Sequence, residues 1–234
     1  MSPYQTRIAT AVLLMAGIGL SALLGQISDQ LGQVLRVRKT VKIEDASGIR
    51  RSLRQKDAIG LDQTIQAYPD SAVELSFDGD GRLMLWPSTK IKLKPPGPKS
   101  ERHSDCDREV VARIELLRGD LQVDHDSDRD VAALKPRILE IETRDARICL
   151  FGTSIQVHVD LNPDVGTGVF VRQTGARVRS LAGDGGWVRL EQSQQTFARR
   201  EGKLRVVTVK RFTLPDQRAE GRFNDSPLFD KIVF

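Results

Sequence analysis

The sequence predicts an all-β protein, either a β-solenoid-like stack or a two-sheet β-sandwich of short strands, preceded by one N-terminal transmembrane or signal helix. Apolar and polar residues alternate with a period of two over most of the chain after Gln33, for example at Val73, Leu75 and Phe77. That period is typical of half-buried strands. Glycine-containing turns separate the alternating runs at close intervals, which favours an all-β fold. Periodicity alone does not choose between a sandwich, a barrel and a stack of β coils.

The composition fits one sizeable domain or two small ones, because 234 residues correspond to about 1.6 domains of ~150 residues each. Hydrophobic residues make up 39% and aromatic residues 5%, so we expect an aliphatic core. There are 36 Lys and Arg residues against 31 Asp and Glu, a net charge of +5. The two signs are interspersed, so no nucleic-acid partner is predicted. Collagen, disordered chains and disulfide-dense miniproteins are excluded by composition.

Residues 1–25 are interpreted as a signal-anchor or a signal peptide. Ile8–Leu24 carries no charge, and as a helix it would span about 26 Å, slightly less than a bilayer core of ~30 Å. Leu20 or Leu23 would stand where a cleavage site needs a small residue, so an uncleaved anchor is favoured. Arg7 precedes the run, and the eleven residues after it lack Lys and Arg. Since long domains translocate largely regardless of charge, we expect the remainder in an extracytoplasmic space, tethered to the membrane.

The remaining elements are expected in the following order. Residues 26–52 form a membrane-proximal linker and the first strands, with Ile27–Val37 as the only stretch that suits a short helix. Asp78–Gly81 and Arg118–Asp120 are expected to be turns between strands. Lys94–Arg108 and Asp124–Asp130 are expected to be long polar loops. The expected strands are Ala72–Phe77, Arg82–Trp86, a strand through Ile91 and Leu93, Ile114–Leu117, Leu121–Val123, Leu139–Thr143, Arg147–Leu150, Ile155–Val159, Gly168–Arg172, Arg177–Leu181, Trp187–Leu190 and Leu204–Val209.

Several short motifs follow one another between Leu53 and Val157. They are Leu53-Arg-Gln-Lys56-Asp57, Ile65–Ser71, Leu75-Ser-Phe77 with the Asp78–Gly81 turn, the series Leu83, Leu85, Pro87, Thr89, Ile91 and Leu93, then Leu116–Leu121, Ile141–Ala146 and Leu150–Val157. In this order and spacing they resemble the FecR domain, the periplasmic part of membrane regulators linked to iron uptake. The resemblance implies a FecR-like β domain over residues 53–160, with 161–234 as a β extension of the same domain.

The chain departs from the pattern of that family in informative ways. Lys56 replaces the usual Gly, Ala67 the usual Thr and Arg144 the usual Pro. Regulators of this family also carry a cytoplasmic sigma-factor-binding region, whereas about seven residues precede the apolar run here. A sigma-factor partner is therefore not expected. The motif residues, such as Gly119, Gly152 and Pro87, are interpreted as structural rather than functional.

No catalytic residue, cofactor or metal site is predicted, and the chain is not expected to be an enzyme. The segment Asp124–Asp130 begins like a calcium loop, but Arg129 and Lys135 stand where Gly and Glu are needed. The spacing of His103 and Cys106 could chelate a metal, yet no second local pair supports zinc. Cys106 and Cys149 are the only cysteines and could form a disulfide in an oxidising compartment, the alternative being two free thiols.

These observations favour a non-enzymatic, membrane-tethered periplasmic FecR-like protein that acts as a sensing, signal-relay or scaffold module. Its expected partner is another cell-envelope protein or a cell-wall glycan, docked on an exposed strand edge. The alternative is a secreted, soluble protein that binds carbohydrate or another small ligand after cleavage of the apolar run. A hydrolase with an unfamiliar site is a third, weaker hypothesis.

Overall fold

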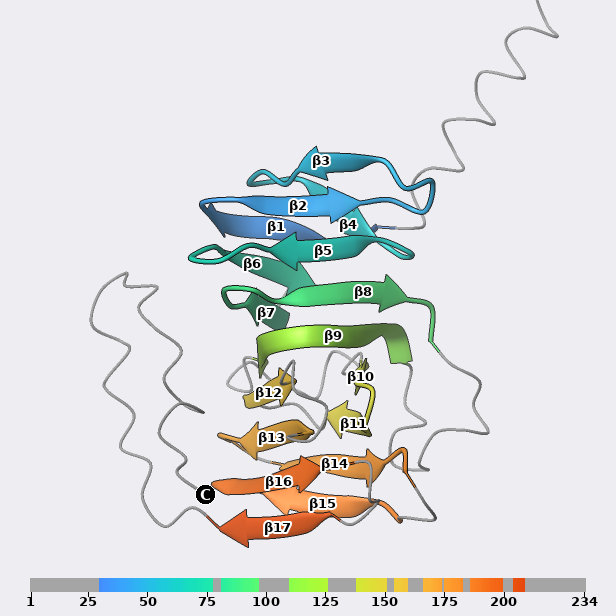
Figure 1. Cartoon of the computed structure of the whole chain (residues 1–234), viewed down its shortest axis with the longest axis vertical. Helices are drawn as coiled ribbons and strands as arrows, with labels where there is room; N and C mark the ends of the chain where they lie inside the picture. Colours follow the sequence, from blue (N-terminus) through green and yellow to red (C-terminus); the bar gives the residue numbers. More distant parts are fainter. Residues whose placement is uncertain are drawn as a thin grey trace, which may run out of the picture. The chain divides into compact units, whose positions relative to one another are not determined.

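The structure is a computed structural model that describes residues 30–77, 81–96, 110–125, 138–150, 154–159, 166–173, 175–182, 186–199 and 204–208. Within these ranges there are seventeen strands and no helix, which confirms the all-β prediction (Figure 1). The predicted N-terminal helix lies outside the described residues. No helix of the described part has the length and apolar character needed to cross a bilayer.

The strands make two sheets that share one long strand, β9 (Val110–His125). Sheet A also contains β1 (Gln30–Arg38), β6 (Ala72–Phe77), β7 (Gly81–Leu85), β12 (Ile155–Val159), β13 (Thr167–Val171), β16 (Gln194–Ala198) and β17 (Arg205–Thr208). Sheet B also contains β2 (Val41–Glu44), β3 (Arg50–Ser52), β5 (Thr64–Ala67), β8 (Lys90–Lys94), β10 (Ile138–Glu142), β11 (Ala146–Leu150), β14 (Gly175–Ser180) and β15 (Val188–Glu191). The short β4 (Ala58–Gly60) pairs with β1.

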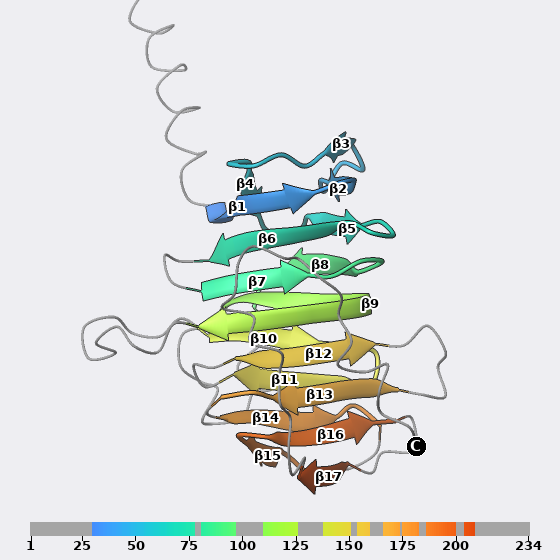
Figure 2. The same ribbon diagram turned by 90° about the vertical axis from the view of Figure 1, so that its left-hand side faces the viewer.

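The chain moves back and forth between the two sheets, mostly in pairs of neighbouring strands. Sheet A runs β1-β6-β7-β9-β12-β13-β16-β17, and every pairing in it is antiparallel. Sheet B runs β3-β2-β5-β8-β9-β10-β11-β14-β15 and has one parallel pairing, between β9 and β10. In Figure 2 the strands β6, β7, β9, β12, β13 and β16 follow one another down one sheet. Strands that are close in the sequence therefore lie close together along the two sheets.

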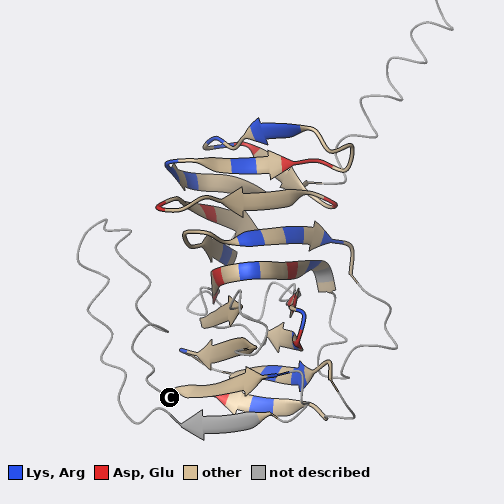
Figure 3. Ribbon diagram, viewed as in Figure 1, with Lys and Arg blue, Asp and Glu red and all other residues tan. Residues whose placement is uncertain are grey.

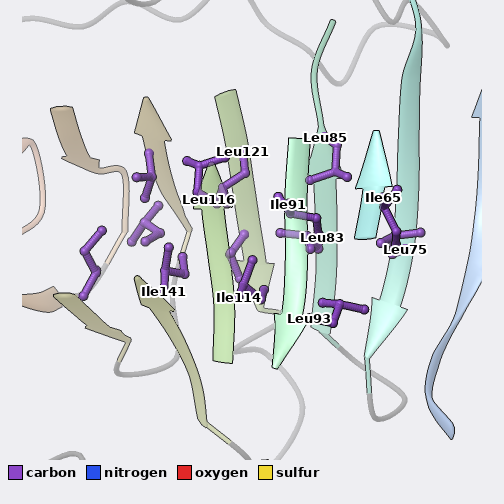
Figure 4. Close-up of a cluster of buried hydrophobic side chains, with 14 of the residues drawn as sticks. Ile65, Leu75, Leu83, Leu85, Ile91, Leu93, Ile114, Leu116, Leu121 and Ile141 are labelled. Carbon is purple, nitrogen blue, oxygen red and sulfur yellow. The ribbon is translucent and has the colours of Figure 1, made fainter. Parts of the chain in front are cut away.

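A single apolar core takes side chains from both sheets. The structure shows the alternation seen in the sequence, as in β8, where Ile91 and Leu93 are buried and the three alternating lysines are partly exposed. Complete burial of each such side chain contributes about 1.5–3 kcal/mol. The largest fully buried side chains, many of them drawn in Figure 4, are Ile59, Ile65, Leu75, Leu83, Leu85, Ile91, Leu93, Ile114, Leu116, Leu121, Ile141 and Ile148.

The short helix considered for Ile27–Val37 is absent from the described part of that stretch, where β1 runs from Gln30 to Arg38 as one of the first strands expected within residues 26–52. A β-bulge lies between Val34 and Arg36, where β1 pairs with β6. The bulge adds one residue, so Val34 and Val37 both pack on the core although they are three residues apart. Spacing by three resembles a helical period, and this misled the sequence prediction.

The turn expected at Arg118–Asp120 is also wrong, since β9 continues through it. The first half of β9 pairs with β8 and β10 in sheet B, and the second half pairs with β7 and β12 in sheet A. Gly119 has φ of 87°, a conformation that glycine adopts without steric cost. The glycine thus lets one strand bend from sheet B into sheet A. Asp124, expected in a loop, belongs to the end of β9.

Two proline turns carry the chain from one sheet to the other. Tyr68–Ser71 links β5 to β6, and Trp86–Thr89 links β7 to β8. Each has proline in second place and a residue with positive φ in third place, Asp70 at 59° and Ser88 at 62°, as in type II turns. The two turns are stacked, because the amide of Ser88 donates to the carbonyl of Tyr68 at 3.3 Å.

The turn before β4 contains Lys56 at φ of 70°, in the place where the resembled family has glycine. A side chain in the left-handed region costs about 1–2 kcal/mol. We predict that Lys56→Gly stabilises the fold by about 1 kcal/mol, part of the gain being offset by the flexibility of glycine in the unfolded chain. Urea unfolding measures this change. Gln55→Gly is the control, since Gln55 has no positive φ and should lose stability, and an equal response of both variants would contradict the prediction.

Candidate functional site

Two motif blocks of the FecR resemblance meet at the bend of β9. The Thr89 hydroxyl, fully buried, donates to the Asp120 carbonyl at 2.8 Å and accepts from the Asp120 amide at 2.9 Å. The amide of Trp86 donates to the same carbonyl at 3.1 Å. A Cβ on Gly119 would lie 2.6 Å from the Thr89 hydroxyl oxygen. These contacts between motif residues stabilise the bend at which β9 passes from sheet B to sheet A.

The third block closes the hairpin between β10 and β11. The Thr143 hydroxyl accepts from the amide of Ala146 at 2.9 Å and lies 2.9 Å from the Thr167 hydroxyl on β13. The Thr167 hydroxyl donates to the Asp145 carboxylate at 3.2 Å. Arg144, in the place of the family's proline, pairs with the same carboxylate at 2.9 Å. The block therefore ties sheet B to sheet A, which supports the structural interpretation of the motif residues.

The outer face of sheet B carries a nearly buried network of ion pairs across β9, β10 and β11. The side chain of Glu140 is 4% exposed and lies 3.4 Å from the Arg113 Nε and 3.3 Å from the Arg147 Nε. Glu142 contacts Arg113 at 3.1 Å and Arg147 at 3.0 Å. The four charges compensate one another in pairs, as buried charges must. Sequence reasoning missed this network, because the partners come from three strands.

Cys149 lies beside this network on the outer face of β11. It is 1% exposed and packs with Val110, and Trp187 lies against the two. Cys106 lies outside the described residues, so the disulfide between them stays a prediction. The alternation pattern of β11 places Cys149 on the outer face, where it predicts exposure. The burial of Cys149 there was therefore not predictable from the sequence.

We predict that the purified, oxidised protein contains the Cys106–Cys149 disulfide. A bridge that closes a loop of this length contributes about 2–4 kcal/mol by restricting the unfolded chain. Alkylation of the unreduced, denatured protein followed by mass spectrometry should leave both cysteines unmodified, and a linked peptide should appear after digestion. Alkylation of both thiols without reductant would contradict the prediction.

The outer face of sheet A brings together a histidine, a serine and two aspartates without forming a catalytic triad. Nδ1 of His158 lies 2.7 Å from the Asp120 carboxylate, and the Ser154 hydroxyl donates to the Asp124 carboxylate. Ser154 and His158 are four residues apart along one extended segment, so their Cα atoms are about 13 Å apart. Proton transfer from this serine to this histidine would need hydrogen-bond distance.

The metal sites considered from the sequence find no support in the described residues. Within them no group of three or more His, Cys, Asp or Glu side chains has an arrangement that could hold a metal ion. Of the calcium-like segment, the side chain of Asp124 is described, and both its oxygens are engaged, one by Ser154 and the other by the Gln122 amide at 2.6 Å. His103 lies outside the described residues.

The end of the sheets formed by β1 to β4 is strongly basic. Residues 30–60 contain eight Lys and Arg and three Asp and Glu, a net charge of +5; the rest of the chain has 28 of each and is neutral. Figure 3 shows basic residues on β3 and β2 at this end. We call the exposed residues Ile49, Arg50, Arg51, Arg54 and Lys56 the basic end cap.

The backbone of the basic end cap is held by two acidic side chains, Asp45 and Asp57, that accept hydrogen bonds within its turns. Asp45 accepts from the amides of Ser47 and Ile49 at 2.9 and 3.0 Å, and the Ser47 hydroxyl bond is the largest cause of its lowered pKa. Burial raises the pKa of Asp57, but bonds from Arg51 and the Arg54 amide outweigh it and leave the pKa below the ordinary value. Both carboxylates are therefore committed to turns, while Ile49 remains 65% exposed.

Comparison with known proteins gives a likeness at the level of the backbone. Two crystal structures described as a "putative anti-sigma factor" from Parabacteroides distasonis each match with a TM-score of 0.45 and 15% sequence identity. Each match covers 62% of this chain and 59% of the other chain, so the likeness spans less than two thirds of that protein. No family model and no curated protein sequence matches the chain.

Proposed function

We propose that this protein is a membrane-tethered, periplasmic FecR-like module that acts without catalysis, as a sensing, signal-relay or scaffold component. The observation that carries the proposal is that the motif residues of the FecR resemblance, such as Thr89, Gly119 and Thr143, serve the crossings between sheets. The motifs thus specify a scaffold. Because the motif residues maintain the fold, partner binding is assigned to the exposed surface. Its charged side chains suit contacts with another envelope component.

The proposal has two parts that one preparation can test. Membranes isolated from cells should retain the chain after salt and carbonate washes, and mass spectrometry of its N-terminus should find Met1 or Ser2. A start near Gln26 would instead support the alternative, a secreted protein that binds carbohydrate or another small ligand. Protease added to spheroplasts should digest the strand region, and protection in intact spheroplasts would contradict the periplasmic location.

Partner binding is tested by crosslinking in intact cells and recovery of the solubilised chain. We expect an envelope protein or a cell-wall glycan to be recovered with the wild-type chain. A variant without residues 97–104 serves as the comparison. It tests whether partner binding needs the polar loop predicted at Lys94–Arg108. Recovery of no envelope component with either chain would remove the support for a binding module.

A further inference from the structure

The basic end cap belongs to the end of the described sheets that contains β1, the first described strand. The apolar run ends at Leu24 and β1 begins at Gln30, and six residue steps span at most about 22 Å. Within β1, Val34 is bonded directly to the cap turn, because its carbonyl accepts from the Lys56 amide at 2.8 Å and its amide donates to the Asp57 carbonyl at 2.9 Å. An uncleaved anchor would thus keep the cap near the bilayer surface.

The chemistry of the basic end cap suits an anionic lipid surface. The segment from Arg50 to Lys56 lies across the end of the sheets with Leu53 as its one buried residue. Arg54 and Lys56 are exposed, and Arg54 also interacts electrostatically with the Asp57 carboxylate. Arg50 pairs with Glu44 at 2.5 Å, but both are partly or largely exposed, and exposed pairs are weak. This end of the sheets therefore presents exposed basic side chains, in a segment with a net charge of +5, although Arg36 and Lys39 of that segment pair with Glu74 and Asp70.

An exposed apolar side chain lies next to these charges. Ile49 is 65% exposed at the end of the turn between β2 and β3 and directly precedes Arg50 and Arg51. An apolar residue flanked by basic residues is a typical arrangement at the boundary between lipid headgroups and acyl chains. A cap that served solubility alone would need only polar residues there.

We infer that the basic end cap docks on the anionic headgroups of the membrane in which the preceding segment is anchored. This inference rests on the tethering part of the proposed function. Docking fixes the orientation of the two sheets relative to the membrane, with both outer faces left open to partners. Each basic residue near an anionic surface strengthens the docked state about fivefold at moderate salt.

The test uses the full chain reconstituted into phosphatidylcholine vesicles with and without phosphatidylglycerol. Hydrogen exchange of the peptide covering Ser47–Lys56 is followed by mass spectrometry after flotation confirms membrane insertion. We expect slower exchange in the anionic vesicles alone, and loss of this protection at high salt, where the Debye length falls to about 3 Å. The double variant Arg54→Glu, Lys56→Glu should weaken docking at least about 25-fold, at ~5-fold per residue, and lose the protection.

The matched control is Lys90→Glu, Lys92→Glu on β8, which makes the same change in net charge away from the cap. Retained protection in this control supports docking through the cap, and equal loss in both variants overturns it. Equal exchange of the wild type in both vesicles, in a chain that floats, overturns the inference and leaves the tether intact. Failure to float overturns the tether itself. Equal protection by soluble polyglutamate would assign the cap to an acidic protein instead of lipid.

Discussion

Gly119→Ala is expected to destabilise the protein by about 3 kcal/mol or more, and to reduce the yield of folded protein. The new Cβ would lie 2.6 Å from the Thr89 hydroxyl oxygen and 2.7 Å from the Thr89 Cα. The second atom is backbone, so a rotamer change at Thr89 does not relieve the contact. The positive φ adds about 1–2 kcal/mol, and overpacking of a tight site costs about 1–3 kcal/mol.

Gly48→Ala provides the matched control for this prediction. Gly48 has φ of 84°, close to that of Gly119, but its Cβ would have no neighbour within 4 Å. This variant should therefore lose only the conformational part, about 1–2 kcal/mol. Chemical denaturation of both variants, together with their soluble yields, measures the difference. If the two variants are equally stable, the stacked contact between the β7–β8 turn and the bend of β9 is not a constraint on the fold.

Arg147→Met is expected to destabilise the fold by about 3–5 kcal/mol, the usual loss when one partner of a buried ion pair is removed. The methionine would leave Glu140, whose side chain is 4% exposed, with half of its ion pairs. Glu142 would lose its 3.0 Å contact. Urea unfolding at neutral pH measures the loss. Addition of Glu140→Gln to this variant should recover part of the stability, because it removes the uncompensated charge.

Arg189→Met on β15 is the matched control on the same face of sheet B. Arg189 and Glu191 approach to 3.7 Å, and their side chains are 65% and 67% exposed. Loss of such an exposed pair should change stability by less than about 1 kcal/mol. Equal losses in the two variants would show that the network of Arg113, Glu140, Glu142 and Arg147 is solvated and contributes little.

Strand positions were predictable from the sequence wherever a strand has one face in the core and one in water. Ile155–Val159 coincides with β12, and Ala72–Phe77 with β6. The prediction failed where two-residue alternation is broken or brief. The bulge in β1 interrupts the alternation, so this strand was not located in the sequence. The bend in β9 lies between two stretches that were predicted as separate strands but form one. The short strands β3 and β4 contain too few residues to show any period.

The interpretation of the motif residues as structural was also accessible from the sequence, because Gly, Pro and Thr at strand ends have local conformational roles. Their mutual contacts were not. Thr89 and Gly119 are thirty residues apart, and only the stacking of successive layers brings them together. The predicted disulfide still awaits its experiment. The ion pairs around Glu140 depend on the register of three strands, which no local pattern encodes.

The amino-acid sequence alone determined the fold class and the aliphatic core, because alternation along a strand is a local property that burial enforces residue by residue. Only the tertiary structure decided how the strands divide between two sheets and which charges become neighbours. These features depend on contacts between residues distant in the sequence, and cross-strand pairing sets such contacts only when the layers assemble.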